Sequence, residues 1–100
     1  DYNHQINLKD PFTYYYIYYE DKEIKGFISY AIIYDRCELN YILIKPEYRK
    51  QGIAHELLMK VVDYARRENK KIIPQCSYAK EVLTKHEEYK DVYNIKWNAR

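Results

Sequence analysis

Cysteine is scarce in this sequence, and its scarcity excludes several classes of protein. Cys37 and Cys76 are the only two cysteines in the 100 residues, and they do not form a C-x-x-C pair. Two isolated thiols argue against a disulfide-stapled fold or a cysteine metal site and favour a reducing, cytoplasmic environment. The three histidines, His4, His55 and His86, are too scattered to predict a metal. We therefore expect no metal cofactor.

The sequence also lacks an excess of charge of one sign and a long apolar run. The formal net charge is only +2, and Lys and Arg are mixed with Asp and Glu along the chain. This distribution is typical of solvated faces and argues against a nucleic-acid partner. No membrane-length apolar run or secretory signal is visible, so we expect no membrane partner. We expect one domain over residues 1–100, as a monomer or homodimer.

Apolar and aromatic residues divide the chain into strands and helices. The predicted strands span residues 12–19, 24–34, 37–44 and 72–76, and the predicted helices span 53–68 and a segment capped by Ser77. The first helix has an apolar face of Ile53, Leu57, Leu58, Val61, Val62 and Ala65, and the second one of Ala79, Val82, Leu83 and His86. Residues 1–11 fit an edge strand or a loose arm, and residues 89–100 a final strand or a packed tail.

The order of these elements predicts the fold. Short connections between the first three strands indicate an antiparallel meander. The strand after the first helix should return parallel to the third strand by a right-handed crossover. Gly26 marks a bulge or a close backbone approach in the second strand. The fold class is therefore α/β (α+β): a mixed sheet, antiparallel and then β-α-β, with helices packed on it.

The joint between the third strand and the first helix has the composition of an anion site. It contains two cations, Arg49 and Lys50, turns at Gly52, and has no Ser, Thr, Asp or Asn well placed to cap the helix. The first amides of the helix therefore have no obvious side-chain acceptor. A phosphate is favoured here by the free amides, the positive end of the helix dipole and the two cations. Gly52 has no Cβ and would let the phosphate approach the backbone.

The same stretch resembles a known family. Residues 49–54, RKQGIA, match the R/Q-x-x-G-x-G/A signature of the Gcn5-related N-acetyltransferases, and residues 44–48, IKPEY, resemble the V-x-P-x-Y run that precedes it. The segments PQCSY at 74–78 and KHEEY at 85–89 are similar to those of a short single-domain subfamily. The resemblance covers most of residues 24–90, with the usual N-terminal helices reduced or absent.

This resemblance implies an N-acetyltransferase that uses acetyl-CoA as its co-substrate. The loop and helix start would hold the pyrophosphate, through Arg49, Lys50, Gln51, Gly52, Ile53, Ala54 and His55. The backbone of the strand before them, including Ile42, Leu43 and Ile44, would hold the thioester. The acceptor would be an amine, on a protein or a polyamine, that attacks directly. The alternative is a degenerate fold that binds an acyl-CoA or a protein partner without turnover.

Three side chains are candidates for the chemistry. Strand alternation places Glu38 on one face with Asn40, Ile42 and Ile44, and so on the side of the expected thioester. Glu38 would there act as the general base. The alternative is an exposed Glu38 that pairs with a cation. Cys76 could instead take the acetyl group covalently, or be a small buried hydrophobe. Tyr78, or Tyr89, could protonate the leaving thiolate, since the N-x-x-A-x-x-x-Y element that does so in longer members is not recognisable.

Overall fold

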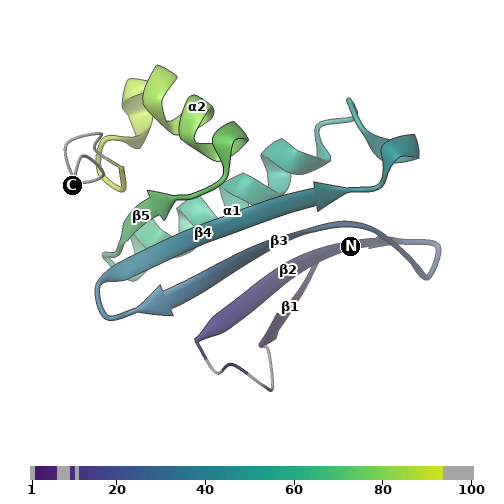
Figure 1. Cartoon of the computed structure of the whole chain (residues 1–100), viewed down its shortest axis with the longest axis horizontal. Coiled ribbons are helices and arrows are strands. Elements are labelled where there is room, and N and C mark those ends of the chain that lie inside the picture. Colours follow the sequence, from purple (N-terminus) through teal and green to yellow (C-terminus); the bar gives the residue numbers. More distant parts are fainter. Residues whose placement is uncertain (1, 7–9, 11, 94–100) are drawn as a thin grey trace.

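A single sheet of five strands forms the body of the protein, and α1 runs along one of its faces (Figure 1). The computed structural model describes residues 2–6, 10 and 12–93. The elements are β1 Tyr2–Ile6, β2 Thr13–Glu20, β3 Glu23–Ile33, β4 Arg36–Ile44, η1 Pro46–Tyr48, α1 Ile53–Arg67, β5 Lys71–Pro74, α2 Ser77–Lys85 and η2 Glu87–Tyr89. Within this part of the chain neither α1 nor α2 is long and apolar enough to span a membrane.

The strands follow one another across the sheet in chain order, β1-β2-β3-β4-β5. β1 to β4 pair antiparallel, and β5 returns parallel to β4 after α1. The predicted meander and crossover are therefore confirmed, and of the two predictions for residues 1–11 the edge strand describes 2–6. In the C-terminal segment Val92 and Tyr93 are buried against the body, while residues 94–100 lie outside the described residues.

Helix α1 supplies six of the sixteen buried residues that the structure describes in the core cluster. All six residues of its predicted apolar face are buried, and they contact the β3 and β4 side chains Ile28, Tyr30, Cys37 and Leu39, none of which is exposed. Removing one such side chain from water contributes about 1.5–3 kcal/mol to folding. This packing fixes α1 along the sheet, and so fixes the position of its first turn.

Two predictions about α2 are wrong. Ser77 is the first residue of the helix, Cys76 occupies the capping position, and no side chain caps the end. His86 lies just beyond the helix and is exposed, so the apolar face consists of buried Ala79 and Leu83 with half-buried Val82. The apolar residues within the helix follow the predicted helical spacing, but the helix ends one residue before His86.

A bulge in β4 changes which residues share a face of the sheet. Leu39 pairs with Tyr30 and Tyr41 pairs with Ser29, so Asn40 is one residue more than β3 supplies. One extra residue reverses the alternation of side chains beyond it. Buried Leu39 therefore shares its face with Ile42 and Ile44, which pack against the core, while Glu38 lies on the opposite face. The predicted common face for Glu38, Ile42 and Ile44 is wrong for this reason.

That opposite face of the sheet is aromatic and largely open. It carries a shallow hollow of about 340 Å³ lined by Tyr15, Ile17, Ile24, Phe27 and Tyr41. The ring of Phe27 meets those of Tyr15 and Tyr41 edge-on, at centroid distances of 5.9 and 5.8 Å. Tyr41 and Leu43 are 47% and 51% exposed. Glu38 therefore lies on the same face of the sheet as an accessible apolar surface.

Candidate functional site

Strands β4 and β5 separate after a short paired region. Their pairing ends with Leu39 opposite Pro74, and the amide of Gln75 then donates to the carbonyl oxygen of Leu39 at 2.9 Å. Proline has no N–H to continue the ladder, and α2 begins at Ser77. In the described part of the chain, residues 40–44 of β4 consequently have no strand beside them on this edge.

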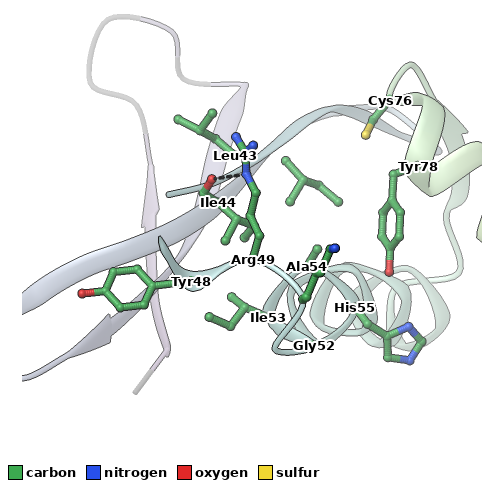
Figure 2. A pocket seen from close by; sticks show the side chains of 12 residues that line it. Leu43, Ile44, Tyr48, Arg49, Gly52, Ile53, Ala54, His55, Cys76 and Tyr78 are labelled. Atoms are coloured by element: carbon green, nitrogen blue, oxygen red, sulfur yellow. Dashed lines mark hydrogen bonds between the residues drawn. The ribbon is translucent and has the colours of Figure 1, made fainter. Parts of the chain in front are cut away.

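A pocket of about 510 Å³ opens at this separation (Figure 2). It joins three parts of the chain: the free edge of β4, the loop and first turn of α1, and the start of α2. Its lining residues are Ile42, Leu43, Ile44, Tyr48, Arg49, Lys50, Gly52, Ile53, Ala54, His55, Cys76 and Tyr78. Its polar end therefore lies at the helix start and its apolar end along the strand.

The start of α1 is built to receive an anion. Gly52 is the capping residue, with a left-handed φ of 84°, and no side chain bonds to the end of the helix. The first helical bond runs from the Glu56 amide to the Gly52 carbonyl oxygen at 3.1 Å, so the amides of residues 53–55 precede the ladder. A Cβ added to Gly52 would meet no atom within 4 Å. The backbone here is thus reachable by a ligand.

Two cations extend this polar end. The Nε of Arg49 donates to the carbonyl oxygen of Ile44 at 3.2 Å, which folds the side chain back along the strand end (Figure 2). Lys50 has a left-handed backbone, with φ of 64°, and with Gly52 it makes the turn into α1 tight. Both residues are exposed and line the pocket. Together with the positive end of the helix dipole they favour a phosphate group.

Cys76 and Tyr78 form the third side of the pocket, where α2 begins. Figure 2 shows the Tyr78 hydroxyl directed toward the first turn of α1, where His55 lies. Burial raises the pKa of this hydroxyl above its usual value, and the neighbouring Cys76, Tyr89 and Glu81 raise it further. Tyr78 therefore keeps its proton at neutral pH and can donate it.

The pocket contains nearly all of the residues predicted from the sequence. Of the ten predicted cofactor residues only Gln51 does not line it, and of the three catalytic candidates only Glu38 does not. Tyr89 is buried elsewhere, with its hydroxyl donating to the Met59 sulfur at 3.5 Å. Tyr48 also lines the pocket and is not among the predicted site residues; the IKPEY run, which ends at Tyr48, is the sequence signal for it.

The sequence and fold of this chain are similar to those of known acetyltransferases. A family model for GCN5-related N-acetyltransferases matches residues 14–92. A candidate ribosomal protein bS18-alanine N-acetyltransferase of Bacillus subtilis (strain 168) is 29% identical over 59 residues, which are 59% of this chain and 39% of that protein. The chain thus spans about two fifths of the length of this curated relative.

Solved structures show the same fold. The solution structure of a GCN5-like candidate N-acetyltransferase from Staphylococcus aureus is 30% identical, with a TM-score of 0.64, over 85% of this chain and 83% of that one. A candidate streptothricin acetyltransferase of Bacillus anthracis str. Ames, in complex with acetyl coenzyme A, is 22% identical, with a TM-score of 0.58, over 67% of this chain and 39% of that one. On the family match, which covers most of the sequence, the chain belongs to the GCN5-related N-acetyltransferase family.

Proposed function

We propose that this protein transfers an acetyl group from acetyl-CoA to an amine, and that the pocket between β4 and β5 binds the acetyl-CoA. One observation carries the proposal: a single pocket connects an uncapped helix N-terminus with the free edge of a strand. The helix N-terminus can bind the pyrophosphate of acetyl-CoA. The free strand edge can hydrogen-bond the amide-bearing arm and the thioester.

The residues at the helix start fit the pyrophosphate. The amides of residues 53–55 precede the helical ladder, and the space in front of Gly52 is open. Arg49 donates to the Ile44 carbonyl oxygen through Nε alone. The other N–H groups of the guanidinium can therefore donate to a phosphate oxygen. We expect the phosphates to lie there and the acyl end to extend along β4.

The free edge of β4 supplies backbone groups for the acyl end. The Ile44 carbonyl points to this edge, since it accepts from Arg49. Backbone direction alternates along a strand, so the N–H and C=O of Ile42 point the same way. An N–H that faces the thioester carbonyl can stabilise the charge that develops on its oxygen during attack. Tyr78, protonated and in the same pocket, is the proposed donor to the departing thiolate.

The open face of the sheet supports a protein amine as the acceptor. Leu43 lines the pocket and lies opposite Phe27 on β3, whose ring borders the hollow on that face. Glu38 is on this face as well, so a base there would meet an acceptor that approaches over the sheet. The name of the Bacillus subtilis relative gives an alanine of a ribosomal protein as its acceptor. We therefore favour an exposed amine on a protein over a polyamine.

A thermal-shift titration with CoA and acetyl-CoA tests the binding part of the proposal. A ligand present at 100 times its Kd adds about 2.7 kcal/mol to stability. For a domain of this size that raises Tm by roughly 10 °C or more. Adenosine and pantetheine, each with only part of the molecule, should shift Tm far less. An unchanged Tm at millimolar acetyl-CoA would contradict both hypotheses, the acetyltransferase and the non-catalytic acyl-CoA-binding module.

Catalysis is tested separately by thiol release. Peptides with a free N-terminal alanine, peptides with lysine, and spermidine should be supplied as acceptors at equal concentration. Release of CoA thiol that depends on a peptide amine supports the transferase and its acceptor class. Binding without release for every amine would leave the non-catalytic module as the correct description.

A further inference from the structure

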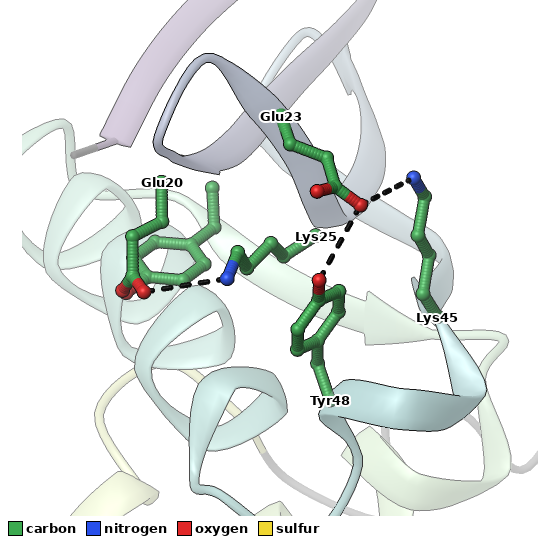
Figure 3. A network of polar contacts seen from close by, with 6 residues as sticks. Glu20, Glu23, Lys25, Lys45 and Tyr48 are labelled. Carbon is green, nitrogen blue, oxygen red and sulfur yellow. Dashed lines mark hydrogen bonds and ion pairs between the residues drawn. The ribbon is translucent and has the colours of Figure 1, made fainter.

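A cluster of charged and aromatic side chains lies beside the loop that leads into α1 (Figure 3). At its centre, the Lys25 ammonium is 4.0 Å from the centroid of the Tyr48 ring and 3.3 Å from a Glu20 carboxylate oxygen. The Lys25 side chain is only 12% exposed. A cation held between an aromatic face and a carboxylate in a mostly buried position attracts both strongly.

The chain places Lys25 there by a bulge in β3. Tyr18 pairs with Gly26 and Tyr19 pairs with Ile24, which leaves Lys25 as the extra residue. A bulge redirects its side chain out of the regular alternation. The next residue, Gly26, lies against the end of β4: a Cβ there would be 2.5 Å from the Ile44 side chain and 2.9 Å from the Leu43 carbonyl oxygen. The close backbone approach predicted at Gly26 is therefore present, and the predicted bulge lies at the residue before it, Lys25.

Tyr48 has a second attachment to the same hairpin. Its hydroxyl donates to a Glu23 carboxylate oxygen at 3.4 Å, and Lys45 donates to that oxygen at 3.3 Å. The turn that carries Tyr48, η1, contains no buried residue. Its position consequently depends on these side-chain contacts and on the packing of the Tyr48 ring. It depends as well on the Lys45 amide, which donates to the Lys25 carbonyl oxygen at 3.0 Å, and on the Arg49 bond to Ile44.

The ammonium of Lys25 stays charged in this setting. Burial by itself would lower the pKa of Lys25, but the hydrogen bond and charge of Glu20 raise it above its ordinary value. The attraction to the Tyr48 ring is therefore present throughout the neutral pH range. Arg49 and Lys50 follow Tyr48 directly, so the place of Tyr48 sets where the cationic loop begins.

We propose that Lys25 is a positioning residue for the anion-binding loop: by holding the Tyr48 ring it keeps residues 49–52 in the geometry that receives the phosphates. This inference rests on the proposed function, in which that loop binds acetyl-CoA. Lys25 is absent from the pocket lining and acts through Tyr48. A loop held in its bound shape binds more tightly because less freedom is lost on binding.

The test compares Lys25→Met, which keeps the aliphatic length, with Lys25→Arg, which restores the cation. Lys85→Met is the matched control, since Lys85 also pairs with a glutamate, at 3.2 Å, but is 67% exposed, lies at the far end of α2 and does not line the pocket. Two readouts are needed: amide hydrogen exchange of residues 49–55 without ligand, and the Kd of CoA by calorimetry. KM and kcat for acetyl-CoA add a third where turnover is present.

In Lys25→Met we expect faster exchange of the loop amides and a Kd for CoA about threefold to tenfold weaker, the range of one partly buried cation–π contact. KM should rise by a similar factor with kcat unchanged. Lys25→Arg should recover most of the loss, and Lys85→Met should match the wild type. Exchange and Kd unchanged in Lys25→Met would overturn the proposal.

The proposal can still be tested if Lys25→Met does not fold or if the wild type binds no CoA. If Lys25→Met does not fold, Glu20→Gln takes its place, because Glu20 is exposed. The neutral amide removes the charge that holds Lys25 but can still accept from the Tyr18 hydroxyl, which donates to Glu20 at 2.7 Å. An unchanged loop and Kd in that variant would overturn the proposal. If the wild type binds no CoA, the proposed function fails. The exchange comparison between Lys25→Met and wild type then still decides whether Lys25 orders the loop.

Discussion

The Nε of Arg49 donates to the carbonyl oxygen of Ile44 at 3.2 Å, so the cationic loop is tied back to the strand end beside it. The carbonyl lies on the same free edge that we propose for the acyl arm. One side chain thus links the two ends of the pocket, and it orients the guanidinium for a second partner.

Replacing Arg49 with methionine should weaken CoA binding by about tenfold to hundredfold, the range expected when a hydrogen bond to a charged group is lost. Tm without ligand should change little, because Arg49 is exposed. Arg49→Lys should recover part of the affinity, since it keeps the charge but cannot bond Ile44 and a phosphate with one planar fork. Calorimetry at two salt concentrations checks this: the gap between wild type and Arg49→Met should narrow at high salt. An equal Kd of CoA for the wild type and Arg49→Met would show that Arg49 does not contact the phosphates.

Gly52 offers a sharper comparison, because asparagine and aspartate have nearly the same shape. Its φ of 84° makes any side chain costly, and Asn tolerates this region best. Gly52→Asn should lower the free energy of unfolding by about 1 kcal/mol and weaken CoA modestly. Gly52→Asp should be at least as stable as Gly52→Asn, since a carboxylate at the start of a helix is favourable.

CoA should nevertheless fail to bind to Gly52→Asp, because the added charge lies against the phosphates. Stability and affinity therefore change in opposite directions between the two variants. Denaturation curves and CoA titrations measure them. Equal CoA affinity in Gly52→Asn and Gly52→Asp would show that no anion lies at the helix start.

The two cysteines should differ in reactivity with a maleimide. Burial raises the pKa of Cys37 to about 12, so at pH 8 only about one molecule in ten thousand carries the thiolate, and its side chain is not exposed. Cys76 lines the pocket and is half-buried. We expect one modified thiol per native chain and two per denatured chain, counted by mass spectrometry. Saturating CoA should slow the native reaction, and Cys76→Ser should abolish it; labelling of native Cys37 would contradict the packing of β4.

The loop into α1 could be predicted from the sequence because its chemistry is local. Arg49, Lys50, Gly52 and the uncapped helix start lie within a few residues, and the apolar period of α1 fixes the helix direction. The faces of β4 could not be predicted, because the bulge at Asn40 depends on which β3 residues lie opposite. Contacts such as Lys25 with Tyr48 join residues far apart in the chain and leave no mark in the local pattern.

The last prediction separates two chemical routes. In direct transfer Glu38 removes a proton from the acceptor, directly or through a water. In covalent transfer the Cys76 thiolate attacks the thioester, takes the acetyl group and releases CoA as its thiolate. An amine acceptor such as lysine has a pKa near 10, so few molecules are neutral at pH 7 and a base contributes about 10²–10⁴-fold.

Glu38→Gln should therefore lower kcat by about a hundredfold with the Kd of acetyl-CoA unchanged, since Glu38 does not line the pocket. Raising the pH should restore part of this loss, because more of the acceptor is then neutral. Cys76→Ala should lower kcat only a few-fold. The covalent route predicts the reverse: Cys76→Ala folded but inactive, full activity in Glu38→Gln, and, without acceptor, a wild-type chain that gains one acetyl group lost on treatment with hydroxylamine. Position favours Cys76, which lines the pocket with Tyr78, whereas the need for a neutral amine favours Glu38. Steady-state kinetics of the two variants, with intact-mass measurement of the wild type, decide between them.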